Sequence, residues 1–184
     1  MGIQTESKAH CFFGLVLLMI FLTTLQPVSA ETAATGKQPL DDSGAMQISE
    51  SDRCPVCAMR VRNHSKFASA IQLADGTTYY FCGTGCMLRS WMHPDVFLGV
   101  EKDRIARAVT RNFFTGAPLD AAAAYWIAGS DIVGPMGPAL VPIGDSDEAD
   151  VFVKRHGGKT IFRLHDLNDQ LWETITGKKA TPSP

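Results

Sequence analysis

The stretch that decides the fold is residues 67–86, FASAIQLADGTTYYFCGTGC. Apolar side chains alternate with small or polar ones from Phe67 to Leu73, and the pattern resumes in Thr77–Phe81 after the dipeptide Asp75-Gly76. Two alternating segments on either side of an Asp-Gly turn are typical of a β-hairpin. The stretch therefore predicts a hairpin whose second strand leads into a glycine-rich turn.

A helix and a third strand are expected after this turn. Apolar residues at positions 87, 88, 91 and 92 recur at helical spacing and stop before Pro94. The segment 104–114 then has the pattern of another strand. Residues 51–118 are therefore predicted to form a β-β-α-β unit, which contains four of the five cysteines.

The second half has the same order of predicted elements and no cysteine. Three strand patterns occur, at Ala124–Ala128, Ala139–Ile143 and Thr160–Leu164. A helix is expected at Asp147–His156, with Asp145 or Ser146 as its cap and Gly157-Gly158 as its left-handed stop. Residues 119–175 thus predict a second β-β-α-β unit. The expected fold class is α+β, with two such units in tandem.

Residues 1–30 have the pattern of a cleaved secretory signal peptide. Lys8 precedes an apolar run, and Val28-Ser29-Ala30 has the small residues of a cleavage site. The run Cys11–Leu25 is shorter than the roughly 18–20 residues that span a bilayer, so an uncleaved anchor is not expected. No cysteine follows Ala30 directly, as a lipoprotein signal would require. We therefore expect a periplasmic or otherwise extracytoplasmic protein whose mature chain has no transmembrane helix.

Two polar segments are expected to flank the folded part. Residues 31–50 are rich in small and polar side chains, which predicts a flexible lead. Residues 176–184 are polar and end in proline and serine, which predicts a frayed tail.

Charge and motif content argue against several classes of function. The chain has 17 Lys and Arg against 19 Asp and Glu, and the cations are scattered, so no nucleic-acid partner is expected. No Ser-His-Asp set, phosphate loop or paired carboxylates occur in a recognisable context, so no enzyme is predicted. A thiol oxidoreductase would have a helix that opens on the first cysteine of its Cys-x-x-Cys motif, whereas a hairpin follows here.

The four cysteines outside the signal peptide form two motifs, Cys54-x-x-Cys57 and Cys82-x-x-x-Cys86. Both sulfurs of a Cys-x-x-Cys turn can face one ion at about 2.3 Å, and Cys86 is expected in the first turn of a helix, where thiolate is favoured. This spacing across a hairpin is typical of a treble-clef or zinc-ribbon-like site. An oxidising compartment allows two disulfides instead. The sequence leaves open whether the two motifs share one site.

Three further residues are candidate metal ligands. Met59 follows the second cysteine, and Met136 lies in the loop Gly134–Pro138. Thioethers are weak ligands for zinc and good ones for copper(I), so these methionines favour copper. His64 is a candidate nitrogen ligand. Three alternatives remain. Met59 packs in the core, Met136 belongs to a structural turn, or the cysteines hold a structural zinc ion.

Several of these motifs resemble known families. The run Cys54–Met59, followed by Tyr79–Cys82, Cys86 and Pro94, resembles the YHS/TRASH-type metal-binding module. With the further motifs Tyr125–Ser130, Gly134-Pro135-Met136-Gly137 and Gly157-Gly158, the chain from Cys54 to Leu167 is similar to the NosL family.

The resemblance implies a copper(I)-binding accessory protein of the cell envelope. It implies that the protein carries or delivers copper to a metalloenzyme, and that nitrous oxide reductase and its maturation machinery are the expected partners. The implied copper ligands are Cys54, Cys57, Met59 and Met136, whereas Cys82 and Cys86 match the TRASH-type version of the site. Ala58 replaces the usual glycine of the family motif, which restricts the turn.

Overall fold

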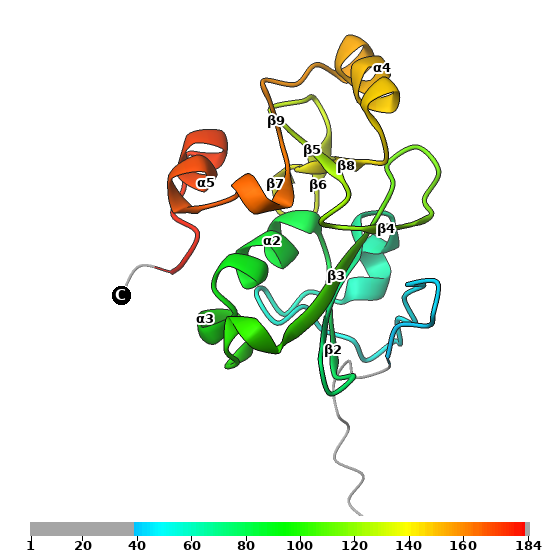
Figure 1. The fold of residues 1–184 in the computed structure, drawn as a ribbon, viewed down its shortest axis with the longest axis vertical. Helices are drawn as coiled ribbons and strands as arrows, with labels where there is room; N and C mark the ends of the chain where they lie inside the picture. Colours follow the sequence, from blue (N-terminus) through cyan, green and yellow to red (C-terminus); the bar gives the residue numbers. More distant parts are fainter. Residues whose placement is uncertain (1–38, 183–184) are drawn as a thin grey trace, which may run out of the picture. The chain divides into compact units, whose positions relative to one another are not determined.

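An antiparallel sheet of four strands forms the first half of the computed structural model, which describes residues 39–182 (Figure 1). Its strands, in the order β2-β1-β3-β4, are β1 (Ser69–Leu73), β2 (Thr78–Phe81), β3 (Ile105–Arg111) and β4 (Pro118–Asp120). The helical elements around them are η1 (Val61–Phe67), α2 (Thr84–Met92), α3 (Pro94–Leu98) and η2 (Lys102–Arg104). The predicted signal peptide, residues 1–30, lies outside the described residues, as do residues 31–38.

The predicted hairpin is formed by β1 and β2. Ile71 faces Tyr79 across the pair, and Gly76 takes a positive φ of 84° in the turn, as an Asp-Gly turn requires. Both strands are almost wholly buried. The hairpin is thus the centre of the first unit.

A second antiparallel sheet has the order β8-β5-β9. Its strands are β5 (Tyr125–Ala128), β8 (Val141–Ile143) and β9 (Thr160–Phe162), and α4 (Ser146–His156) connects the last two. In both sheets the first strand is central, the second strand lies on one side and the strand after the helix lies on the other. This repeated topology confirms the predicted α+β fold of two tandem β-β-α-β units.

The predicted cap at the start of α4 is also confirmed. The carboxylate of Asp145 accepts a hydrogen bond from the backbone N–H of Glu148 at 2.8 Å. Gly157 follows the last helical residue with a positive φ of 70°, but its ψ of −172° differs from the left-handed helical conformation that the sequence predicts.

Several short elements were not expected from the sequence. They are β6 (Val133–Gly134), β7 (Gly137–Pro138), η3 (Leu164–Asp166) and α5 (Asp169–Thr176), in addition to β4 and α3. Strands of two or three residues are too short to show an alternating pattern. The start of α5 did carry a local signal, because the side chain of Asn168 accepts a hydrogen bond from the N–H of Leu171.

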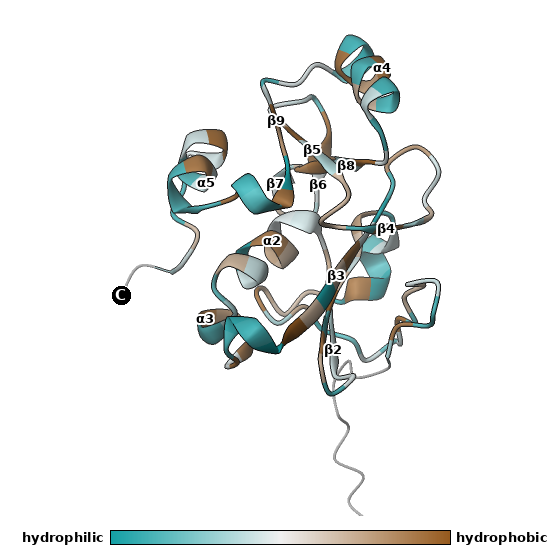
Figure 2. Ribbon diagram, in the orientation of Figure 1, coloured by the Kyte–Doolittle hydropathy of each residue, from teal (hydrophilic) through white to brown (hydrophobic). Residues whose placement is uncertain are grey.

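One hydrophobic core includes residues of both β-β-α-β units. It joins Phe81 and Leu88 of the first unit to Trp126 and Phe162 of the second. A smaller cluster, centred on Phe152 of α4, covers the other side of β5 and β8. Figure 2 shows the hydrophobic residues along β5 and β8 and the mixed faces of α4.

The predicted flexible lead is wrong for residues 39–50. Leu40 is buried, and Met46 and Ile48 pack against the main core. The backbone N–H of Gln47 donates to the Tyr80 hydroxyl at 3.1 Å. Three apolar side chains in an otherwise polar segment are sufficient to hold it against the core.

The predicted frayed tail is wrong as far as residue 180. Ala180 is only 3% exposed, and its carbonyl accepts a hydrogen bond from Nε of Arg89 on α2. A buried contact beyond the end of α5 therefore fastens the chain to the first unit.

Within residues 39–182, every helix is too short or too polar to cross a lipid bilayer.

Candidate metal centre

The structure brings all four cysteines of the two motifs together. Cys54 and Cys57 come from the loop before η1, Cys82 ends the hairpin, and Cys86 lies in the first turn of α2. Their Sγ atoms all lie within 4.8 Å of one another. The two motifs therefore form one sulfur cluster.

The separations of the sulfur atoms suit a shared metal ion. Cys57 Sγ lies 3.4 Å from Cys82 Sγ and 4.0 Å from Cys86 Sγ. Four thiolates at about 2.3 Å from a tetrahedral ion would be about 3.8 Å apart. Sulfurs joined in a disulfide would be about 2 Å apart, and all four cysteines are free. The cluster thus has the dimensions of a metal site.

The four thiols differ in their access to solvent. Cys54, Cys82 and Cys86 are 1%, 0% and 3% exposed, whereas Cys57 is only partly buried. An ion held by all four sulfurs would therefore be reached from the side of Cys57.

The loop that carries Cys54 and Cys57 is closed by backbone hydrogen bonds. The N–H of Cys54 donates to the carbonyl of Met59 at 3.0 Å, and the N–H of Ala58 donates to the carbonyl of Cys54 at 2.8 Å. Ala58 takes a φ of 58°, and among residues 39–182 it is the one non-glycine residue with a positive φ. The loop thus forces an alanine into a conformation that glycine adopts freely.

We expect Ala58→Gly to raise the free energy of unfolding. A left-handed residue with a Cβ costs about 1–2 kcal/mol, and glycine loses about 0.5–1 kcal/mol more backbone entropy on folding, so the net gain is about 0.5–1 kcal/mol. Urea unfolding of the metal-free protein measures this gain. Ala122→Gly is the matched control, because Ala122 is an exposed turn residue without a positive φ and its replacement should cost about 0.4–1 kcal/mol. A loss of stability in Ala58→Gly would contradict the left-handed turn.

Hydrogen bonds between the thiols favour the thiolate form of Cys54. Bonds donated by Cys82 and Cys86 hold the pKa of the Cys54 thiol far below its usual value. Donating these bonds to the Cys54 sulfur raises the pKa of Cys82 and of Cys86, and burial raises it further. A thiolate at Cys54 would attract a cation, and a bound metal ion would displace the protons of the other thiols.

The start of α2 adds to this attraction. Gly83 precedes the helix and Cys86 is its third residue, so the free amide groups of the first turn lie beside the sulfurs. The hydroxyl of Thr84 donates to the carbonyl of Leu140 at 2.7 Å and ties this turn to the second unit. Both features hold the second cysteine motif in place.

The other three predicted ligands, Met59, His64 and Met136, lie in different parts of the first and second units. Met59 packs against the main core, and its carbonyl closes the loop around Cys54. His64 lies in η1 and is not part of the four-cysteine cluster. Met136 is 52% exposed between β6 and β7. The roles of these three residues as ligands stay predictions.

The loop of Met136 nevertheless lies against the metal centre. A Cβ built on Gly83 would lie 3.4 Å from Cδ of Pro135, so the loop contacts the turn between Cys82 and Cys86. Met136 and Cys86 also line the same cleft, which has a volume of about 640 Å³. No local pattern in the sequence predicts this contact, because it joins segments about fifty residues apart.

Comparisons with known proteins agree with this geometry. The copper-binding lipoprotein NosL of Stutzerimonas stutzeri is 27% identical over 125 residues, which cover 66% of this chain and 65% of that protein. The crystal structure of the copper chaperone NosL from Shewanella denitrificans has the same fold, with a TM-score of 0.57 at 17% identity, and the match covers 70% of this chain and 98% of that chain. The family model described as NosL matches residues 45–172. This chain therefore belongs to the NosL family.

Proposed function

We propose that this protein binds copper(I) at the sulfur cluster of Cys54, Cys57, Cys82 and Cys86 and carries it. The observation that supports this most directly is the convergence of the four Sγ atoms within 4.8 Å. Soft thiolate ligands select soft ions, of which copper(I) is one. The names of the two relatives, a copper-binding lipoprotein and a copper chaperone, favour copper among these ions.

The proposed route of transfer runs through Cys57 and Met136. Three of the sulfurs are buried, so an acceptor would replace the partly exposed Cys57 first. The thioether of Met136 is exposed on the loop that touches Gly83, where it can hold copper as the ion leaves. Met59 and His64 are secondary candidates for the same exchange.

We propose a recipient in the cell envelope, by family resemblance nitrous oxide reductase with its maturation machinery. The name of the Stutzerimonas stutzeri relative, a lipoprotein, supports an extracytoplasmic location. The charge of the chain, −2 overall with no basic stripe, gives no support to a nucleic-acid partner.

A structural zinc ion is the second candidate function. Sulfur separations of 3.4 and 4.0 Å suit the four-coordinate tetrahedral geometry that zinc adopts with cysteine ligands. In that case the ion would stabilise the first unit and would not exchange.

A metal competition separates the two functions. The purified, reduced protein is loaded with one equivalent of zinc under anaerobic conditions and then titrated with copper(I). The carrier function predicts that copper displaces zinc and that a copper(I) chelator can then withdraw it. Retention of zinc, together with unfolding when zinc is removed, would show a structural zinc site.

The contribution of Met136 is tested with Met136→Leu, which keeps the volume of the side chain and removes its sulfur. Loss of one ligand contact of about 1.4 kcal/mol should slow the transfer of copper to the chelator about tenfold. Met92→Leu is the control, because Met92 packs against the core at the end of α2 and should leave the rate unchanged. Equal rates for both variants would remove Met136 from the route.

A further inference from the structure

The cleft beside the metal centre has walls from four parts of the chain. They are the first half of α2, the second half of α5 with the turn that follows it, the β6–β7 loop, and the adjoining ends of β5 and β9. Its volume of about 640 Å³ is in the range of sites that hold a small molecule or a few residues of a peptide. Cys86 and Met136 both line it, so anything bound there lies next to the sulfur cluster.

The cleft is positively charged, although the chain as a whole is slightly acidic. Arg89, Lys159 and Lys178 line it, and its lining residues include no aspartate or glutamate. Within residues 39–182, the carboxylates that form ion pairs do so with Arg62, Arg104 or histidines, and none of them pairs with Arg89, Lys159 or Lys178. Three unpaired positive charges in a concave site attract a negatively charged ligand.

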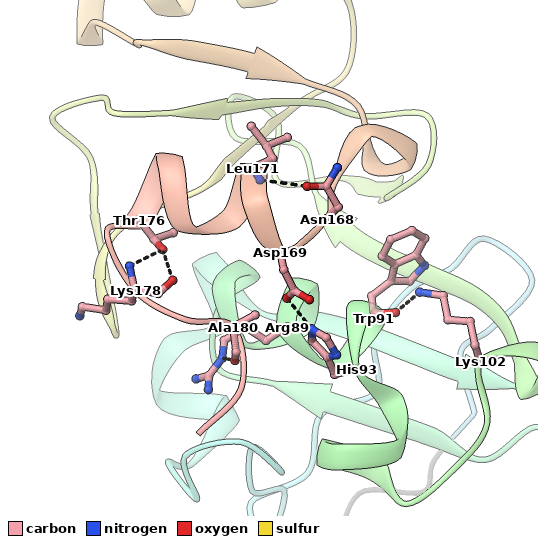
Figure 3. A network of polar contacts seen from close by, with 10 residues as sticks. All are labelled: Arg89, Trp91, His93, Lys102, Asn168, Asp169, Leu171, Thr176, Lys178 and Ala180. Carbon is pink, nitrogen blue, oxygen red and sulfur yellow. Dashed lines mark hydrogen bonds and ion pairs between the residues drawn. The ribbon is translucent and has the colours of Figure 1, made fainter. Parts of the chain in front are cut away.

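The wall formed by α5 is fastened in place (Figure 3). Nε2 of His93, at the end of α2, lies 2.7 Å from Oδ1 of Asp169 at the start of α5. The bond from Arg89 to the carbonyl of Ala180 holds the other end. Because Asp169 is paired with His93 and does not line the cleft, it does not neutralise the cations that line it.

One edge of the cleft is also suited to an extended peptide. β9 is one of the two edge strands of the sheet β8-β5-β9, and its first residue, Thr160, lines the cleft together with the preceding Lys159. The outer edge of such a strand presents backbone groups that can pair with an added strand. The charge and the strand edge together favour an acidic peptide over a small anion.

We propose that this cleft docks an extended acidic segment of the protein that exchanges copper with the sulfur cluster. The proposal rests on the proposed function, because it assigns a partner to the same metal centre. A docked segment would present its own ligands beside Cys86 and Met136. A flat anionic membrane would not enter a concave site of this kind.

Binding of capped octapeptides to the purified, metal-free protein tests the proposal. The probes are acetylated and amidated (Glu-Val)₄ and (Lys-Val)₄, and calorimetry measures their dissociation constants at low and high salt. We expect the glutamate peptide to bind, the lysine peptide not to bind, and high salt to weaken binding. Lys159→Glu/Lys178→Glu should weaken binding at least about tenfold, because it reverses two of the three charges.

Lys154→Glu/Arg155→Glu is the matched control, because it makes the same change of net charge on the exposed end of α4 and should leave binding within about twofold. Equal binding of both peptides, or equal loss in both double variants, would overturn the proposal. Displacement of the peptide by equimolar citrate would assign the cleft to a small anion, and tighter binding to phosphatidylglycerol vesicles would assign it to a membrane. Copper(I) affinity, measured separately, should be the same in all these variants, so a failure of docking and a failure of copper binding are told apart.

Discussion

Cys82→Ser is expected to lower the copper(I) affinity of the protein by at least about 100-fold. Removing a residue that only orients a metal ligand costs about 10–100-fold, and the loss of a thiolate ligand should cost more. Cys82 is fully buried, and its sulfur lies 3.4 Å from that of Cys57 inside the cluster. Serine has nearly the same volume but offers a hard oxygen, which copper(I) binds poorly.

Affinity is measured by competition with a chromophoric copper(I) chelator under anaerobic conditions. Ser69→Ala is the control, because the Ser69 hydroxyl is buried and donates to the carbonyl of Gly83 beside the cluster without offering a sulfur ligand. It should leave the affinity within a few-fold of the unmodified protein. An unchanged affinity in Cys82→Ser would mean that the first motif and the methionines hold copper without the second motif.

Gly158→Ala is expected to destabilise the protein by about 2–5 kcal/mol. Gly158 has a φ of 155°, and a Cβ at this position would lie 2.7 Å from Cγ2 of Ile127 in the buried strand β5. The conformation costs about 1–2 kcal/mol for a residue with a Cβ, and overpacking a core costs about 1–3 kcal/mol. Urea unfolding of the metal-free protein measures the sum.

Gly157→Ala separates the two contributions. Gly157 also has a positive φ, of 70°, but nothing lies within 4 Å of a Cβ built there. The free energy of unfolding of Gly157→Ala should therefore fall only by the conformational cost, about 1–2 kcal/mol. Equal losses in the two variants would show that Ile127 and its neighbours yield to the added methyl group.

The elements that the sequence predicts well have strong local signals. The Asp75-Gly76 turn between alternating segments, and the cap by Asp145 at the start of α4, each depend on residues only a few positions apart. The repeated β-β-α-β order followed from these elements, and the matching strand orders confirm it.

The features that the sequence did not predict depend on contacts between distant segments. The two cysteine motifs are separated by the whole hairpin, so their convergence depends on how the loop before η1 packs against α2. Leu40 and Ala180 are buried only because the folded core offers a surface to each of them. The cleft collects its three cations from α2, the start of β9 and the segment after α5, and no periodicity connects them.

We propose that one copper ion binds to sulfur atoms of both cysteine motifs. The most direct test is X-ray absorption at the copper edge. The unmodified protein and Cys82→Ser are each loaded anaerobically with one equivalent of copper(I) and measured side by side. We expect one copper per chain with only sulfur neighbours, and one sulfur neighbour fewer in the variant. A first shell with nitrogen or oxygen neighbours, or an identical spectrum in Cys82→Ser, would contradict it.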